Sequence, residues 1–156
     1  MIEYRDDPAS LRPDQLVGFF EGWPEAPTPE THLRLLRGSD VAIVAIDDAT
    51  DRVVGFVTAV TDGVLAASVP LLEVIPEHRG RGIGRSLMRR VREALRDIYM
   101  IDLTCDEGLV PFYRSLGYER LTAMVIRDGA RRRGRGAPGA GGSGGRADDG
   151  GDASAD

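Results

Sequence analysis

The residues best suited to chemistry gather in the stretch "VIPEHRGRGIGRSLM", Val74 to Met88. Pro76 ends a run of β-forming residues, and glycines follow at 80, 82 and 84 ahead of a helical pattern. Successive backbone N–H groups at a helix N-terminus attract an anion, and glycine lets a phosphate approach the chain closely. The sequence therefore predicts a phosphate-binding loop over residues 79–86. A tight structural turn is the alternative interpretation of the same glycines.

Two common phosphate loops do not match this stretch. A P-loop requires Gly-Lys-Ser/Thr, and all 20 basic residues of the chain are arginine. A dinucleotide-binding fold requires G-x-G-x-x-G after an early strand, whereas this loop reads "GRGIG" and comes after the middle of the chain. A different fold must therefore position the loop.

Hydrophobic periodicity predicts the elements around the loop. Apolar residues at helical spacing predict helices over 10–23, 28–38, 83–98 and 109–117. Runs rich in β-branched residues predict strands over 41–47, 52–60, 64–75, 99–105 and 120–127. The order ααβββαβαβ describes one mixed α/β (α+β) domain over residues 1–128.

Composition limits the classes of function. A chain of 156 residues with 42% hydrophobic and 29% charged residues is typical of one globular domain. Its net charge of −5 argues against general binding of nucleic acid. The one cysteine, Cys105, cannot form an internal disulfide, and no apolar run approaches the roughly 20 residues of a membrane helix. We therefore expect a cytoplasmic protein that does not bind a membrane.

Residues 129–156 differ in composition from the rest of the chain. They consist of small and charged residues with no large apolar side chain, which predicts a disordered tail. The run "RRRGRG" at its start suits either contact with nucleic acid or a solvated tail, and the solvated tail is the simpler interpretation.

The stretch "LEVIPEHRGRGIGRSLM" resembles the acetyl-CoA motif of the GCN5-related N-acetyltransferase (GNAT) family, Gln/Arg-x-x-Gly-x-Gly/Ala, with Arg79, Gly82 and Gly84 at its fixed positions. "PFYRSLGYERLTAMVIR" resembles the later segment of that family, where a helix bearing Phe-Tyr ends at Leu-Gly-Tyr. The patterns "GFFEGWP" and "CDEGLVPFY" resemble an uncharacterised bacterial subgroup. The resemblance implies the acyl-CoA N-acyltransferase fold, with a mostly antiparallel sheet flanked by helices.

The same resemblance implies acetyl-CoA as co-substrate. Two histidines and one cysteine at these spacings predict no metal site. The strands on either side of the glycine-loop helix would separate near 72–74 and 103–105, and the pantetheine arm would lie between them. The implied cofactor-binding residues are Val74, Ile75, Arg79, Gly80, Arg81, Gly82, Ile83, Gly84, Arg85 and Ser86. Arg89, Arg92 and Arg96 continue the arginine stripe of Arg85, either to attract the 3′-phosphate or as a solvated helix face.

Transfer of an acetyl group from a thioester to an amine requires a base, an acid and donors to the oxyanion. Tyr113 lies where the family commonly has its general-acid tyrosine, although "FY" also suits an aromatic core pair. Glu73 interrupts an apolar strand, so it is either the base or a structural carboxylate. Simple alternation places Ser68 and Pro70 on the face of Leu72 and Val74, where the family usually has its base, and neither is a base.

Other residues point less clearly to a role. Asp106 lies near a common family asparagine and is equally suited to cap a helix. Cys105 is expected to be a small buried hydrophobe, His32 to lie on a helix surface, and His78 in an exposed loop. Phe19, Phe20 and Trp23 line the acceptor side or pack the helices on the sheet.

The sequence as a whole favours an acetyl-CoA-dependent N-acetyltransferase acting by direct transfer in a ternary complex. The acceptor would be the amine of a small molecule or a peptide, and an acidic protein slightly favours a cationic one. A non-catalytic acyl-CoA-binding regulatory module is the alternative. Family members are often homodimers, so the resemblance also admits a homodimer.

Overall fold

The computed structural model describes residues 1–127, and within them five strands form one sheet in the order β1-β2-β3-β4-β5. The strands are β1 (Ile2–Arg5), β2 (Val41–Asp47), β3 (Arg52–Thr61), β4 (Ala66–Val74) and β5 (Met100–Asp102). The first four are antiparallel to their neighbours, and β5 runs parallel to β4. The predicted mixed, mostly antiparallel sheet flanked by helices is therefore confirmed.

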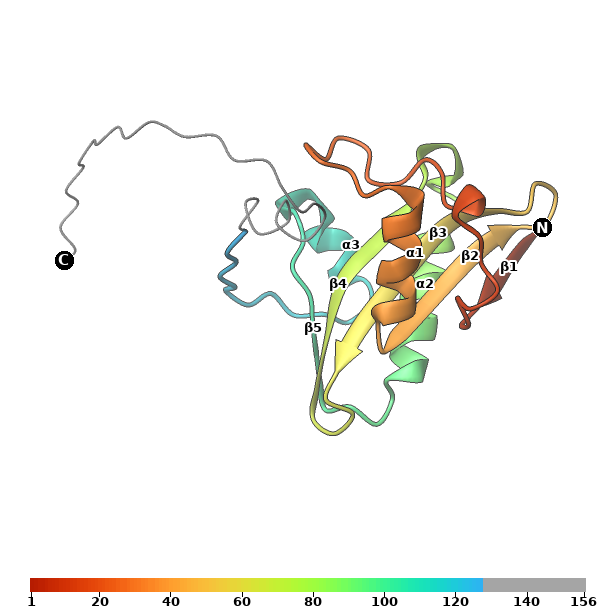
Figure 1. Cartoon of the computed structure of the whole chain (residues 1–156). Helices are drawn as coiled ribbons and strands as arrows, with labels where there is room; N and C mark the ends of the chain where they lie inside the picture. Colours follow the sequence, from red (N-terminus) through yellow and green to blue (C-terminus); the bar gives the residue numbers. More distant parts are fainter. Residues whose placement is uncertain (128–156) are drawn as a thin grey trace, which may run out of the picture. The chain divides into compact units, whose positions relative to one another are not determined.

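The helices cover both faces of this sheet (Figure 1). They are α1 (Pro29–Gly38), α2 (Ile83–Ala94) and α3 (Val110–Arg114), with single 3₁₀ turns at Pro13–Gln15, Pro76–His78 and Glu107–Leu109. The α1 face buries a cluster around Leu36, Val44 and Phe56, and the α2 face buries one around Val57, Leu87 and Val91. Both faces of β2 and β3 are thus apolar, which explains their continuous hydrophobic runs.

The helix α1 begins where its capping residues predicted. The Thr28 side chain accepts a hydrogen bond from the Thr31 N–H at 3.3 Å, and Pro29 is the first helical residue. The apolar stripe predicted along 83–98 is confirmed at Ile83, Leu87, Val91 and Leu95, each at most 3% exposed. Ile98 of the same stripe lies beyond the end of α2 at Ala94 and is only partly buried.

A bulge in β4 alters which side chains share a face. Val60 of β3 lies opposite Ser68, and Thr58 lies opposite Leu71. Three residue steps along β4 therefore correspond to two along β3, which is a β-bulge. The extra residue falls at Val69–Pro70, where a proline is tolerated because it needs no ladder donor. Ser68 therefore shares the α1 face with Leu71 and Glu73, and simple alternation along β4 was wrong here.

The prediction and the structure differ most in three segments of the chain. The helix predicted over 10–23 is reduced to the Pro13–Gln15 turn, because Gly18, Phe20 and Gly22 have left-handed φ angles of 94°, 61° and 80°. The strand β1 was not predicted, although Ile2 and Tyr4 alternate and pack on the α2-face cluster. Residues 120–127 form no strand, since β-branched residues alone do not make one without a paired neighbour.

The chain divides into a unit spanning Met1–Leu121, which contains every helix and strand described here, and a second unit from Thr122 onward. The tail predicted over 129–156 lies outside the described residues. None of the helices among residues 1–127 is both long enough and apolar enough to cross a membrane.

Candidate functional site

The strands β4 and β5 separate after the third of the nine residues of β4. Their pairing covers only Ala66, Ala67 and Ser68 opposite Met100, Ile101 and Asp102. Ser68 Oγ donates to Asp102 Oδ1 at 2.7 Å at the last paired position. The bulge follows directly, and beyond it the edge of β4 no longer pairs with β5. The separation expected near 72–74 and 103–105 is therefore present.

The backbone of Val74 faces this opened edge. The Ile75 N–H donates to the Val54 carbonyl of β3 at 3.0 Å, and the Ile75 carbonyl accepts from the His78 N–H at 3.0 Å. Backbone groups in an antiparallel pair alternate between the two edges of a strand, so the Val74 N–H points away from β3. Val74 thus remains a backbone donor toward the opening, whereas Ile75, 0% exposed, belongs to the sheet. The N–H of Ile75, one of the residues expected to bind the cofactor, is thus paired within the sheet.

The glycine loop leads from this edge into α2. Gly80 and Gly82 have φ angles of 74° and 79°, and a Cβ on either glycine would meet no atom within 4 Å. The first helical hydrogen bond runs from the Ser86 N–H to the Gly82 carbonyl at 3.0 Å. The N–H groups of residues 83–85 therefore have no acceptor inside the helix, as in any helix N-terminus that binds an anion.

Side chains around the loop hold it in place. Arg79 Nε donates to the Val74 carbonyl at 2.9 Å, which ties the loop to the end of β4. A Cβ on Gly84 would lie 3.8 Å from both Phe112 and Val74, so the helix passes close to both. The Arg81 side chain is exposed beside the loop, where its charge adds to the attraction for an anion.

The carboxylate of Glu73 is half-buried on the α1 face. Its Oε1 accepts a hydrogen bond from the Phe20 N–H at 2.8 Å. Burial raises the pKa of Glu73 above its ordinary value, while the Phe20 N–H and the charge of Arg79 act in the opposite direction. A carboxyl group whose pKa is raised toward neutrality is better matched to take a proton from an amine.

Tyr113 lies on the other face of the sheet, in the cluster with α2. Its ring packs edge-on against Phe112 and Tyr118, with centroids 5.0 Å and 5.9 Å away. Burial raises the pKa of Tyr113 to about 12, and the Cys105 side chain in the loop after β5 adds to the shift. With a pKa of about 12, Tyr113 keeps its proton at any physiological pH.

Some residues whose role the sequence left open lie in surroundings that differ from those predicted. Cys105 is exposed rather than buried, because β5 ends at Asp102 and residue 105 lies in the following loop. His32 is 1% exposed rather than on a helix surface, since the aromatic rings of Phe19, Phe20 and Phe56 enclose it. Asp106 precedes a 3₁₀ turn, but its side chain makes no cap hydrogen bond.

The arginines along α2 contact different partners. Arg85 donates to Ser115 Oγ at 2.9 Å, and Arg92 donates to the Leu116 carbonyl at 2.7 Å, so both contact the segment around α3. Arg96 instead lies 3.5 Å from Glu93 and 3.7 Å from Asp97 at the surface, the predicted solvated face. Neither interpretation of the stripe included the contacts with α3.

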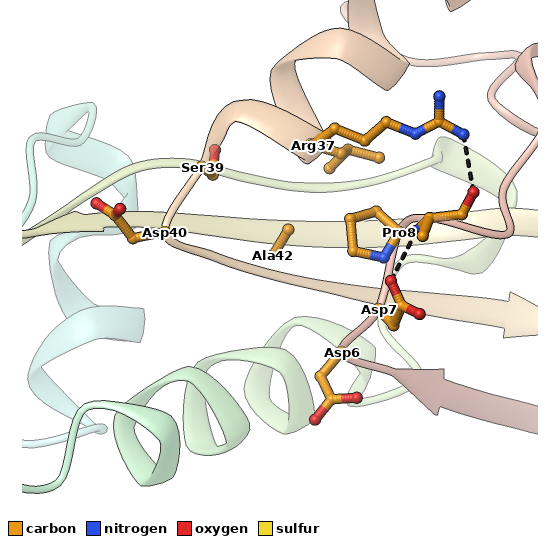
Figure 2. Close-up of a pocket in the computed structure, with 9 residues that line it drawn as sticks. Asp6, Asp7, Pro8, Arg37, Ser39, Asp40 and Ala42 are labelled. Carbon is orange, nitrogen blue, oxygen red and sulfur yellow. Dashed lines mark hydrogen bonds between the residues drawn. The ribbon is translucent and has the colours of Figure 1, made fainter.

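A hollow of about 510 Å³ lies elsewhere on the molecule, between the end of β1 and the end of α1 (Figure 2). There Arg37 donates to the Ala9 carbonyl at 2.9 Å, and the Ala9 N–H donates to Asp7 at 2.8 Å (Figure 2). These polar groups bind one another, and no predicted site residue lines the hollow. The opening at β4 and β5 remains the candidate site.

Comparison with known proteins agrees with this geometry. Residues 38–120, more than half of the chain, match the family described as "Acetyltransferase (GNAT) domain". A "putative acetyltransferase" of Deinococcus radiodurans is 49% identical, and its structure superposes with a TM-score of 0.78 over 81% of this chain and 87% of that one. A GNAT family protein of Streptococcus pneumoniae is 28% identical with a TM-score of 0.67, covering 83% of this chain and 99% of that one.

A third relative is the "Uncharacterized N-acetyltransferase ycf52" of Porphyra purpurea, 28% identical over 62% of this chain. The chain spans 27% to 58% of the length of the curated relatives that it matches. The matched region contains β2 to β5, the glycine loop, α2 and α3. The chain belongs to the GNAT family of acetyltransferases.

Proposed function

We propose that this protein is an N-acetyltransferase that moves an acetyl group from acetyl-CoA to a primary amine by direct transfer in a ternary complex. The observation that carries the proposal is the opening between β4 and β5. The Val74 N–H faces it, the N-terminus of α2 adjoins it, and Glu73 and Tyr113 lie on opposite faces of the sheet around it. An acid and a base on opposite faces suit a thioester held between the strands.

Binding of acetyl-CoA would use the backbone more than side chains. The free edge of β4 offers its backbone groups to the pantetheine arm, as a further strand would use them. The loop from Gly80 to Gly84 and the following Arg85 and Ser86 offer backbone N–H groups to the pyrophosphate, whose charge also suits the dipole of α2. A Cβ on Gly80 or Gly82 would meet no atom within 4 Å, so the loop leaves room for a phosphate.

Acetyl transfer forms a bond from nitrogen to the acetyl carbon and breaks the bond from that carbon to sulfur. Glu73 accepts the proton that the amine must lose, directly or through a water. The Val74 N–H donates to the oxygen on which negative charge develops. Tyr113 has a pKa of about 12 and is therefore protonated at neutral pH. It donates its proton to the leaving thiolate, and the reference pKa of a thiol is about 8.5.

The acceptor would approach from the α1 face, where Glu73 meets the segment 19–23. Phe20 is buried, but Trp23 is 50% exposed and packs edge-on against the Phe20 ring, with centroids 5.3 Å apart. The carboxylate of Glu21 is close enough to Glu73 to raise its pKa further. Two carboxylates and an exposed indole favour a cationic amine.

The first experiment measures the thermal unfolding midpoint with and without acetyl-CoA. Ligand at about 100 times its Kd adds roughly 2.7 kcal/mol, or a few degrees for a domain of this size. Release of the CoA thiol is then followed with small amines, an aminoglycoside and a lysine peptide. Binding with turnover supports the proposal, binding without turnover on any amine supports an acyl-CoA-binding regulatory module, and no thermal shift at millimolar acetyl-CoA contradicts both.

The role of Tyr113 is tested on the best acceptor. We expect Tyr113→Phe to lower kcat at least tenfold with little change in KM for acetyl-CoA, because the ring and its packing stay while the proton donor is lost. A loss smaller than tenfold would remove Tyr113 from the mechanism and leave it as an aromatic core residue.

A further inference from the structure

The helix that carries Tyr113 is too short to be stable alone. It has five residues, Val110–Arg114, and isolated helices below roughly 12 residues are marginal in water. The position of the Tyr113 hydroxyl therefore depends on contacts that other elements make with this helix.

The turn after α3 wraps around the Tyr113 backbone. The Tyr113 carbonyl accepts hydrogen bonds from the Leu116 N–H at 3.0 Å and the Tyr118 N–H at 3.2 Å. Gly117, with a φ angle of 88°, permits this left-handed turn. Two backbone hydrogen bonds, one from Leu116 and one from Tyr118, therefore connect this turn to Tyr113.

Arg92 of α2 holds this turn from outside. Its Nη1 donates to the Leu116 carbonyl at 2.7 Å, across 24 positions of the chain. The guanidinium also lies near Gly117, because a Cβ on that glycine would be 3.9 Å from Arg92 Nη1. A cation at the C-terminal end of a helix satisfies carbonyls that lack helical partners and is favoured by the dipole.

A second contact, made by Arg85, supports the start of the same turn. Arg85 Nη2 donates to Ser115 Oγ at 2.9 Å, and Ser115 Oγ donates to the Phe112 carbonyl at 2.6 Å. Arg85 adjoins the proposed pyrophosphate site, so a phosphate can compete for its guanidinium. Arg92 lies about two turns further along α2, away from the loop, and donates to the Leu116 carbonyl.

We propose that Arg92 is a positioning residue for Tyr113, holding the turn after α3 and with it the backbone from which the phenol projects. This role rests on the proposed function, in which Tyr113 is the acid. Arg92 does not touch the reacting atoms. It acts through the Leu116 carbonyl and the backbone of Tyr113, and it couples the acid to the helix that begins at the glycine loop.

The test compares Arg92→Ala with Arg90→Ala in the full chain. Arg90 is the matched control because it also lies on α2 and contacts another element, with its guanidinium 4.3 Å from the Tyr4 ring of β1. Two readouts are used: amide hydrogen exchange of the peptide 107–118, and the separate values of kcat and KM for acetyl-CoA.

We expect Arg92→Ala to speed exchange in 107–118 and to lower kcat by about tenfold or more at nearly constant KM, since a misplacement of roughly 1 Å can cost about 100-fold. Arg92→Lys should restore part of both, and Arg90→Ala should change neither. Unchanged exchange in 107–118 overturns the proposal, as does faster exchange with an unchanged kcat. If no amine is turned over at all, the proposed function fails, and exchange alone decides whether Arg92 holds this turn.

Discussion

The carboxylate of Glu73 accepts a hydrogen bond from the backbone N–H of Phe20 at 2.8 Å, across 53 positions of the chain. Phe20 presents this N–H because its φ angle is 61°, a left-handed conformation that a bulky residue rarely adopts. Its ring, 2% exposed, packs against His32 and Phe56 and holds the backbone there. One oxygen of Glu73 thus fixes the loop that contains Phe20, and the other is available for the role of base that we propose.

Replacing Glu73 by Gln separates these two roles. The amide oxygen still accepts from Phe20, so the loop should stay in place, while kcat should fall by about 100-fold because the base is lost. Steady-state kinetics on the best amine measure this, with Glu3→Gln as an exposed control. A kcat within about threefold of the wild type would make Glu73 purely structural.

The same substitution should not destabilise the fold near neutral pH. Because burial raises the pKa of Glu73, the folded state holds this proton more tightly than the unfolded state does. The stability of the wild type therefore falls as pH rises through the interval between the ordinary and the raised pKa. We expect Glu73→Gln to unfold at the same temperature as the wild type or higher at neutral pH. A clear drop would show that the ionised carboxylate itself stabilises the loop.

His32 should make the protein sensitive to acid. Burial lowers its pKa from 6.5 to about 4, and neither ring nitrogen has a hydrogen-bond partner among the described residues. Between those values the unfolded state binds the proton and the folded state does not, so stability is full above about pH 6.5 and falls as pH drops toward 4. The loss is at most roughly 3 kcal/mol. The free energy of unfolding in denaturant, measured at about pH 4 and pH 6.5 for the wild type and for His32→Leu, tests this loss. The contribution of all other titrating groups is common to both proteins and cancels in the comparison. Equal pH slopes would contradict the prediction.

Substitution at Gly82 tests the loop against a matched glycine. Gly82 and Gly63 have φ angles of 79° and 74°, and a Cβ on either would meet no atom within 4 Å. Gly82→Ala and Gly63→Ala should therefore each cost about 1–2 kcal/mol of backbone strain. Only Gly82→Ala should also weaken acetyl-CoA binding, by about tenfold or more in calorimetry, because the loop must approach the pyrophosphate. Equal affinities in the two variants would place the ligand elsewhere.

Gly55 should prove intolerant of any side chain. A Cβ there would lie 3.2 Å from the Glu73 carbonyl and from side-chain atoms of Ile83 and Leu87. Gly55→Ala must push α2 away from β3, and we expect a loss of about 1–3 kcal/mol together with a raised KM for acetyl-CoA. Gly38→Ala, where a Cβ meets nothing within 4 Å, is the control. Similar unfolding midpoints for the two variants would show that α2 adjusts without strain.

The sequence alone determined the elements whose signals are local. Thr28 and Pro29 marked the start of α1, the β-branched runs marked β2 and β3, and the glycines at 80 and 82 marked the loop before α2. Each of these signals depends on a few adjacent residues and on steric rules that hold in any fold. The glycine loop also carried the resemblance to the family.

Tertiary structure decided which groups of the site face one another. The bulge at Val69–Pro70 needs β3 as its reference, so sequence alternation could not reveal that Ser68 shares a face with Glu73. Pairing with Val54 withdrew the Ile75 N–H from the site, and packing of aromatic rings buried His32 and bent Phe20 toward Glu73. The hold of Arg92 on Leu116 likewise joins two segments that only the folded sheet brings together. A backbone hydrogen bond or a buried ring depends on a partner that packing supplies. That partner lies far away in the sequence, so a short stretch of sequence cannot reveal it.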